Sequence, residues 1–478
     1  MATLRFRRDG TFRVLQMADV QDGPSVDPDT VRLIRAAIRA SDPDLVVFTG
    51  DQIRGYDPAW INTFLRRRGE TPGERVRAVT VFEARCRHRF GRNGSDGCDG
   101  SDGRGADPLD DARAKVGSCL GGFLSPLVEA GVPFAATYGN HDFQCGILAD
   151  EQDDIYRTFA GCLNPPAGSS PLALEPGTFA LPVVSSRQPD HIVMSVVMVN
   201  SGDYAAADAG ESHDRREYAR NPRNPRNLDL ADSDGYGTPT PAAVNWLDSV
   251  QHELSERNGD GKPVPSIAFQ HIPPQEFYHC LRQVPPMTPN AVEGSRTFAG
   301  HCYALDHAIC APGSVLGESI GCADTNCGEV EAMTAAGGYF ALYCGHDHKN
   351  AFVGHTDGLD LGYAPTCGFA SYGPASRHRG IRLFEFHESA PTAYTTRMLT
   401  YGELVGRRSG NEMRVFVGDH LVIDAATLRD QLRRPAVFTG VAAVSIAVSL
   451  GFASIIRAIA RGISRSAVKR TKRPTAMD

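Results

Sequence analysis

The chain has 478 residues, of which 41% are apolar and 22% are charged, and its formal net charge is −7. These values are typical of a soluble protein with one large domain or two smaller ones. A mildly acidic chain lacks the excess of lysine and arginine that binding to a nucleic acid backbone requires, so no nucleic acid partner is expected.

The N-terminus carries positive charge, but no apolar run or small-residue cleavage site follows it. We therefore expect no secretory signal and a catalytic part in the cytoplasm. In that compartment the twelve cysteines are expected to be reduced thiols.

Apolar segments recur along the chain, and the residue just beyond each of them is polar or begins a polar motif. Continuous runs of β-branched and other apolar residues are typical of buried strands. The expected strands are residues 12–18, 44–49, 132–138, 192–199, 265–270 and 339–344.

Helical patterns lie between these expected strands. Residues 30–40 place Val31, Ile34 and Ile38 on one face, and a second helix is expected at 241–257. Strands that alternate with helices predict an α/β layered fold, in which functional residues lie on loops beyond the strand ends.

Residues 91–111 are rich in glycine and aspartate and too polar to contribute to a core. We expect a disordered surface insertion. A calcium loop is the alternative, but the segment lacks the ligand spacing and terminal glutamate of an EF-hand.

Four polar clusters and one histidine at the ends of apolar runs dominate the chain. Aspartate, asparagine and histidine are the donors that divalent manganese, iron or zinc accept, so these clusters predict a site for two metal ions that hydrolyses a phosphate ester. An isolated histidine is more often structural, but the joint pattern favours a metal site. The clusters are Asp19, Gly50-Asp51, Gly139-Asn140-His141-Asp142 and Gly345-His346-Asp347-His348, and the histidine is His271.

These motifs resemble the calcineurin-like metallophosphoesterase superfamily, whose members share Asp-x-His, Gly-Asp, Gly-Asn-His-Asp/Glu, His and Gly-His-x-His blocks. The resemblance covers roughly residues 12–386. It implies a four-layer α-β-β-α sandwich and the hydrolysis of phosphate esters. Residues 49–53 and 269–273 look most similar to the purple-acid-phosphatase-like branch, although Arg54 stands where the iron-binding tyrosine of true purple acid phosphatases would be.

Carried over residue by residue, the resemblance implies two divalent metal ions and no other cofactor. Asp51 would bridge both ions, because two nearby cations need a shared carboxylate to screen their repulsion. The implied ligands are Asp19 and His348 for the first ion, and Asn140, His271 and His346 for the second.

The resemblance also implies that His141 touches the substrate. It would donate a proton to the leaving alkoxide or a hydrogen bond to a phosphoryl oxygen. Asp142 would hold its ring, since a neighbouring carboxylate favours the protonated imidazole that a general acid needs. The alternative role for Asp142 is a loop cap.

The first motif departs from the family pattern, because Gln21 stands where a histidine is expected. A glutamine carbonyl ligates a hard cation but is a weaker donor than imidazole for zinc or iron, which favours manganese. Asp22 is an alternative ligand. If neither residue binds, the chain would be a catalytically weakened metal-binding or scaffold protein.

The sequence determines the substrate class less well than the type of reaction. A phosphomonoesterase is favoured, with a nucleotide phosphodiesterase as the alternative, and no residue separates the two. The sequence does not indicate an oligomeric state.

The catalytic domain is expected to span residues 1–390, followed by an extension at 391–434, an apolar helix at 435–458 and a basic tail at 459–478. Residues 436–456 carry no charge and are long enough to span a bilayer. The basic tail would lie in the cytoplasm by the positive-inside rule, which is where the catalytic domain is also expected. A single span cannot satisfy both expectations, so a tail anchor with an exported basic tail, an interfacial helix and a helix packed against a partner remain open. Membrane attachment is favoured over a buried core helix.

Overall fold

The computed structural model describes residues 3–55, 57–60, 63, 71–72, 108–204, 227–228, 235–422 and 425–470. The expected insertion at 91–111 lies mostly outside these residues. Its last four residues, 108–111, form the first turn of helix α3 (Pro108–Ala130), so the prediction of a loop is wrong there. Asp110 and Asp111 suit this position, because carboxylates interact favourably with the free amide groups of a helix N-terminus.

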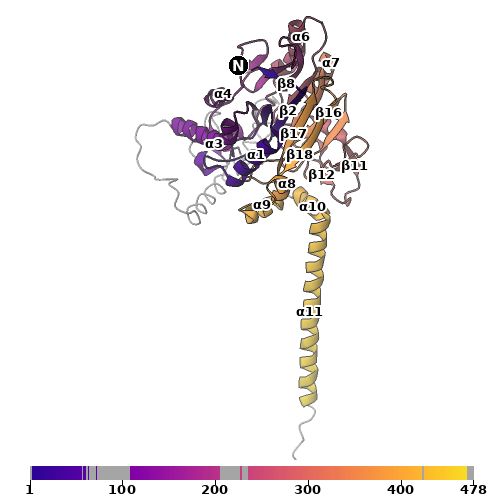
Figure 1. The fold of residues 1–478 in the computed structure, drawn as a ribbon. Coiled ribbons are helices and arrows are strands. Elements are labelled where there is room, and N and C mark those ends of the chain that lie inside the picture. Colours follow the sequence, from indigo (N-terminus) through magenta and orange to yellow (C-terminus); the bar gives the residue numbers. More distant parts are fainter. Residues whose placement is uncertain are drawn as a thin grey trace, which may run out of the picture.

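Two large β-sheets form the centre of the molecule (Figure 1). The eight-stranded sheet has the order β1-β7-β8-β10-β14-β16-β15, with β6 beside β7. The five-stranded sheet has the order β18-β17-β2-β3-β5. The first contains β1 (Leu4–Arg5), β6 (Ala173–Glu175), β7 (Thr178–Val184), β8 (Ile192–Met198), β10 (Ser266–Phe269), β14 (Tyr339–Cys344), β15 (Val353–Thr356) and β16 (Leu359–Tyr363), and the second contains β2 (Thr11–Met17), β3 (Leu45–Thr49), β5 (Phe134–Thr137), β17 (Gly380–His387) and β18 (Thr395–Thr400).

Helices and two small sheets complete the described part of the chain. The expected helices at 30–40 and 241–257 are confirmed as α1 and α6, and the six expected strands are confirmed as β2, β3, β5, β8, β10 and β14. The helices besides α3 are α1 (Pro28–Ser41), α4 (Ala149–Arg157), α6 (Pro241–Asn258), α7 (Glu329–Ala336), α8 (Tyr401–Leu404), α9 (Glu412–Asp419), α10 (Ala425–Arg433) and α11 (Pro435–Arg470), and the small sheets are β11 (Leu281–Val284), β12 (Val292–Glu293) and β13 (Cys302–Leu305), and β4 (Thr71–Pro72) with β9 (Asn227–Leu228).

The five-stranded sheet is apolar on both faces, because each face packs against another layer. Along β3, Val46 and Phe48 lie in one core cluster with side chains of α1, α3 and α4. The alternating residues Leu45 and Val47 lie in a second cluster with residues of β8, β10 and β14. Since successive side chains of a strand point to opposite faces, β3 is buried between a helical layer and the other sheet.

The eight-stranded sheet shows the same arrangement on its outer side. Val197 of β8 and Leu342 of β14 pack with Trp246 of α6 and Met333 of α7. Their strand neighbours Val196 and Ala341 face the five-stranded sheet. Helices therefore cover both outer faces of two stacked sheets, which confirms the expected α-β-β-α sandwich.

The five-stranded sheet continues beyond residue 390. Strand β18 pairs antiparallel with β17 over six residue pairs, from Gly380 with Thr400 to Glu385 with Thr395. The expected domain boundary at 390 therefore falls inside the connection between two paired strands. The ten cysteines of the described residues are free thiols.

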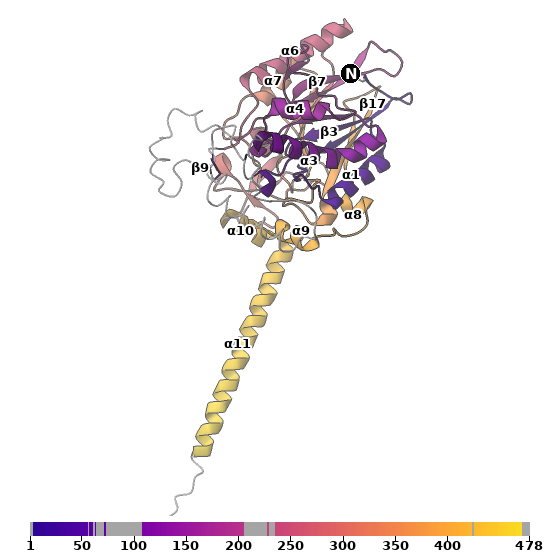
Figure 2. The same ribbon diagram turned by 90° about the vertical axis from the view of Figure 1, so that its left-hand side faces the viewer.

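Helix α11 projects from the base of the sandwich (Figures 1 and 2). Its segment Pro435–Arg457 is the one part of the described chain whose length and apolar composition suit a membrane span. None of that segment is buried against the rest of the protein. The expected apolar helix at 435–458 is therefore present and exposed.

One buried carboxyl group in the outer helical layer gives a pH-dependent stability. Glu329 lies in the first turn of α7, and Gln270 Nε2 donates a 2.8 Å hydrogen bond to its Oε1. Burial raises the pKa of Glu329 from 4.5 to about 8. Between these values the folded protein keeps a proton that the unfolded chain has lost, so its stability falls as the pH rises through this range.

Replacing Glu329 by glutamine keeps the accepting oxygen and removes this proton. Glu329→Gln is expected to raise the melting temperature by a few degrees at pH 8 and to change it much less at pH 4.5. Thermal denaturation followed by circular dichroism at both pH values measures this. Glu331→Gln, at an exposed position of the same helix, is the control, and an equal gain in that variant would contradict the assignment.

Candidate metal centre

The sequence motifs lie on loops that leave the carboxyl ends of five strands. Strands β2, β3 and β5 are parallel neighbours in one sheet, and β10 and β14 are parallel neighbours in the other. Loops after parallel strands gather at one edge of a sheet. The predicted residues reach this edge as Asp19 and Gln21 after β2, Asp51 after β3, Asn140 after β5, His271 after β10, and His346 and His348 after β14.

Asp51, His271 and His346 form a buried cluster whose donor atoms all lie within 4.8 Å of one another. Asp51 Oδ2 is 3.2 Å from His271 Nε2, which is 3.2 Å from His346 Nδ1. Asn140 Oδ1 is buried and has no hydrogen-bond partner among the described residues. A buried polar atom without a partner is costly, and a cation would satisfy this one. The cluster therefore fits a divalent metal ion.

A second group of donors adjoins the first. Asp19 Oδ1 lies 3.4 Å from His348 Nε2 and, like Asn140 Oδ1, is buried without a hydrogen-bond partner in the described chain. The other carboxylate oxygen, Asp19 Oδ2, accepts a 3.0 Å hydrogen bond from the backbone N–H of His346. One oxygen of Asp19 is thus fixed by the loop after β14, and the other suits a metal ion.

Backbone carbonyls set the orientation of two of the imidazole rings. The Nδ1 atom of His271 lies 2.8 Å from the carbonyl oxygen of Thr49, and that of His348 lies 2.8 Å from the carbonyl oxygen of Tyr372. A carbonyl accepts a hydrogen bond only from a protonated nitrogen, so Nδ1 of each ring carries a hydrogen and Nε2 is the atom that faces the acidic residues. Hydrogen bonds of this kind are common around metal-binding histidines.

The two oxygens of Asp51 have different surroundings. Oδ1 accepts a 2.8 Å hydrogen bond from the backbone N–H of His141. Oδ2 faces His271 and also accepts a 2.9 Å hydrogen bond from Gln21 Nε2. Gln21 therefore reaches the centre that the sequence predicts, but in this structure it donates to Asp51 Oδ2.

The charges of the cluster are strongly coupled. Burial favours the uncharged form of His271, but the charge of Asp51 outweighs it and raises the pKa of His271 to about 9. Burial and the charge of His271 hold the pKa of His346 well below its usual value. Despite its own burial, Asp51 has a lowered pKa because His271 and His141 stabilise its charge. The carboxylate of Asp51 is thus held in its charged form, and a cation bound there would replace the proton on His271.

Backbone strain is concentrated at these positions. Asp19, Gln21, Asp51 and His346 have positive φ angles of 52°, 38°, 53° and 74°, which are uncommon for residues other than glycine. Gly139 shows how close the loops are, because a Cβ atom there would lie 2.3 Å from Asp51 Oδ1. The packing of the loops therefore holds several implied ligands in unfavourable backbone conformations.

His141 lies beside the cluster and is only partly buried. Its Nε2 is 3.9 Å from Asp51 Oδ2, and its Nδ1 is 2.8 Å from Gln144 Oε1. Gln144 is thus the residue that orients the ring. The sequence motif ends before Gln144, and its role follows from a 3₁₀ turn over Asp142–Cys145 that returns its side chain to His141.

The prediction that Asp142 holds the His141 ring is wrong. Asp142 Oδ2 accepts hydrogen bonds of 2.8 Å from the backbone N–H groups of Asp51 and Gly139, and Oδ1 accepts one of 2.9 Å from Ile53. Both carboxylate oxygens of Asp142 therefore accept hydrogen bonds from backbone N–H groups of neighbouring loops. Burial, followed by the charge of Asp51, raises the pKa of Asp142 to about 7. The alternative role, a loop cap, describes the geometry.

Asp22, the alternative ligand beside Gln21, points away from the centre. Its Oδ1 accepts a hydrogen bond of 3.1 Å from the backbone N–H of Asp27, and its Oδ2 accepts one of 2.9 Å from the hydroxyl of Thr30. Both oxygens are therefore used to fix the start of α1.

Comparison with known proteins gives remote relatives. No family model matches the chain. A protein named probable inactive purple acid phosphatase 29, from Arabidopsis thaliana, is 22% identical over 408 residues, which cover 80% of this chain and 78% of the relative. Probable inactive purple acid phosphatase 28, from the same plant, is 23% identical over 405 residues, with 80% and 77% covered.

Two solved structures show low overall similarity. A dimetal phosphatase from Danio rerio has a TM-score of 0.37 and 13% identity, with 82% of this chain and 99% of that chain covered. PhoD has a TM-score of 0.38 and 10% identity, with 83% and 69% covered. The motif order, the sandwich of two sheets and the purple-acid-phosphatase-like relatives in sequence are consistent with the calcineurin-like metallophosphoesterase superfamily.

Proposed function

We propose that the protein is a metal-dependent phosphoesterase that hydrolyses phosphate esters, with phosphomonoesters as the favoured substrates. The observation that carries the proposal is the convergence of Asp51, His271 and His346 within 4.8 Å at the strand ends. The unpartnered buried oxygens of Asp19 and Asn140 beside this cluster support a ligand set for two ions.

The proposed ligands divide between two adjacent sites, and the carboxylate of Asp51 would contribute to both. One site takes Asp19, Gln21 and His348, and the other takes Asn140, His271 and His346. Two divalent cations bound there would supply a water molecule of lowered pKa and neutralise charge on the phosphoryl oxygens. Manganese is the favoured metal, because two of the proposed donors are amide oxygens, which suit a harder cation.

His141 is the proposed general acid of the reaction. Gln144 Oε1 accepts from its Nδ1–H, so the ring presents Nε2 toward the same side as Asp51 Oδ2. In the protonated ring, Nε2–H would donate to the leaving alkoxide while Nδ1–H stays on Gln144. The hydrogen bonds of Asp142 to the backbone support a separate part for this residue, which is to hold the loops of Asp51 and Gly139 together.

Replacing Gln144 tests the orientation of His141. Gln144→Ala is expected to lower kcat about tenfold with little change in KM, because general acid catalysis depends on geometry. Gln144→Glu is expected to keep activity to higher pH, since a carboxylate favours the protonated imidazole. Steady-state kinetics between pH 5 and 9 measure both effects. A pH profile of Gln144→Glu that matches the parent protein would contradict the proposed contact.

The proposed activity is tested with aryl phosphates on the full chain. We expect hydrolysis of p-nitrophenyl phosphate that depends on added manganese and exceeds hydrolysis of bis-p-nitrophenyl phosphate. Faster hydrolysis of the diester would indicate the alternative, a phosphodiesterase. If neither aryl phosphate is hydrolysed in the presence of manganese, iron or zinc, the proposed activity on generic aryl phosphate esters is contradicted.

A second candidate is a metal-binding protein with weak or no catalysis. Two observations favour it, namely the Gln21 hydrogen bond on the shared oxygen of Asp51 and the word inactive in the names of the Arabidopsis relatives. Such a protein would bind one ion at Asn140, His271 and His346. Metal analysis of the purified chain separates this candidate from an enzyme with two ions.

We also propose that α11 attaches the protein to a membrane, with the catalytic domain in the cytoplasm. The segment Pro435–Arg457 has 23 residues, and at about 1.5 Å per residue it matches the thickness of the hydrocarbon core. Arg434 lies just before this apolar segment and Arg457 closes it. Cationic side chains at these positions suit the headgroup regions of a bilayer.

A further inference from the structure

The segment between the sandwich and α11 exposes large apolar side chains. These side chains belong to α9, the loop that follows it and α10. Those that are more than 40% exposed are Met413, Phe416, Val417, Leu421, Val422 and Leu428, with exposed fractions between 44% and 76%. We call these six residues the apolar collar.

The side chains that this segment buries are largely polar. Asp419 and Gln431 are 8% and 9% exposed, and Val415 is one of its few buried apolar residues. A surface segment of a soluble protein usually buries its apolar side chains and exposes its polar ones. The reversed pattern here indicates that the apolar collar faces a nonaqueous environment.

Hydrogen bonds within the segment, together with a hydrogen bond from the sandwich, keep it in this orientation. Lys349 Nζ, next to the proposed ligand His348, donates to the carbonyl oxygen of Asp419 at 2.8 Å. Gln431 Nε2 donates to the same oxygen at 2.9 Å, and Arg434 donates to Asp419 Oδ1 at 2.9 Å. The polar side of the segment is therefore fixed to the loop of the metal centre, and its apolar side cannot turn inward without losing these bonds.

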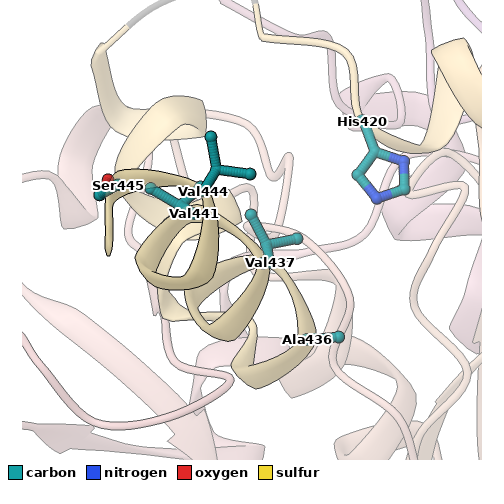
Figure 3. A pocket seen from close by; sticks show the side chains of 7 residues that line it. His420, Ala436, Val437, Val441, Val444 and Ser445 are labelled. Carbon is teal, nitrogen blue, oxygen red and sulfur yellow. The ribbon is translucent and has the colours of Figure 1, made fainter. Parts of the chain in front are cut away.

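The apolar collar is continuous with α11. Helix α10 ends at Arg433 and α11 begins at Pro435, and the two helices lie at the same end of the sandwich (Figure 2). A groove of about 460 Å³ separates His420 from the first turns of α11, and Val437, Val441 and Val444 line it (Figure 3). Exposed apolar side chains thus lie on both sides of this groove, in the loop after α9 and on the first turns of α11.

We infer that the apolar collar is a lipid-binding surface that rests in the interface of the bilayer that α11 enters. This inference rests on the proposed membrane attachment of α11. Insertion of α11 would bring the end of the sandwich from which it emerges against the lipid, and burial of the collar would add to the anchoring by the hydrophobic effect. Exposed Arg407 and Arg408, just before α9, would meet anionic headgroups.

Two tryptophan substitutions test this surface in the full chain. The protein has two tryptophans, Trp60 and Trp246, and both are buried. Phe416→Trp and Val417→Trp place a reporter on the collar, and Val128→Trp places the matched control on an exposed apolar position of α3. The probe is a vesicle of phosphatidylcholine and phosphatidylserine that contains brominated phosphatidylcholine, which quenches tryptophan on contact.

The expected result is flotation of all variants with the vesicles, and loss of most of the added emission of Phe416→Trp and Val417→Trp but not of Val128→Trp. If the variants float but the three added tryptophans are quenched equally, the apolar collar is not a lipid-binding surface. Helix α11 alone would then anchor the protein. Absence of flotation would overturn both the collar and the anchor. Metal-dependent hydrolysis by the same samples is measured separately, so neither outcome is confused with failure of the proposed phosphoesterase.

Discussion

Asp51→Asn is expected to remove metal-dependent hydrolysis of p-nitrophenyl phosphate, with a loss of at least about 100-fold. The reason is the position of Asp51, whose Oδ2 lies 3.2 Å from His271 Nε2 and whose carboxylate would hold both proposed ions. Asparagine has the same shape but no charge, so it cannot offset the repulsion between two cations or between the histidines around it. Both ions should be lost together.

Metal analysis distinguishes this mechanism from a general loss of structure. The parent protein, desalted after incubation with manganese, should keep about two ions per chain, as a two-metal site requires, and Asp51→Asn should keep fewer than one. Asp150→Asn, an exposed change in the first turn of α4, should match the parent in both measurements. Hydrolysis by Asp51→Asn at the parent rate would place the activity elsewhere in the protein.

Much of the fold could be predicted from apolar runs because the buried strands are nearly continuous in apolar character. Strands β8, β10 and β14 lie between two packed layers, so neither face contains polar residues that would obscure the pattern. Strand β18 was outside the predicted domain because its residues alternate between exposed and partly buried. Such an edge strand resembles a loop in sequence, and only its pairing with β17 shows its place.

In the site, likewise, residues that follow apolar strands can be predicted from the sequence, whereas residues placed by a local turn cannot. Asp19, Asp51 and His271 directly follow strands, so strand ends and residue chemistry together predict their meeting. The partner of His141 depends on a single turn of 3₁₀ helix, which directs Gln144 toward the ring and Asp142 toward the backbone. Adjacent residues of a turn point in different directions, and sequence adjacency alone does not distinguish them.

Gln21→His is expected to raise hydrolysis at limiting manganese by about tenfold or more, a size that changes around metal sites commonly produce. The substitution creates the Asp-x-His pattern and places an imidazole, instead of an amide, two residues after Asp19. It also removes the 2.9 Å hydrogen bond that Gln21 Nε2 donates to Asp51 Oδ2. The φ angle of 38° at this position is one that histidine tolerates better than most residues.

Gln21→Ala is the matched variant, because it removes the hydrogen bond without offering a ligand. If imidazole ligation is the cause, Gln21→His should reach half-maximal activity at a lower manganese concentration, and Gln21→Ala should not. Equal gains in the two variants would instead show that the hydrogen bond to Asp51 limits the parent enzyme. A loss of activity in both would show that the amide oxygen of Gln21 already serves as a ligand, and that the first site is adapted to a harder cation than an imidazole ligand would favour.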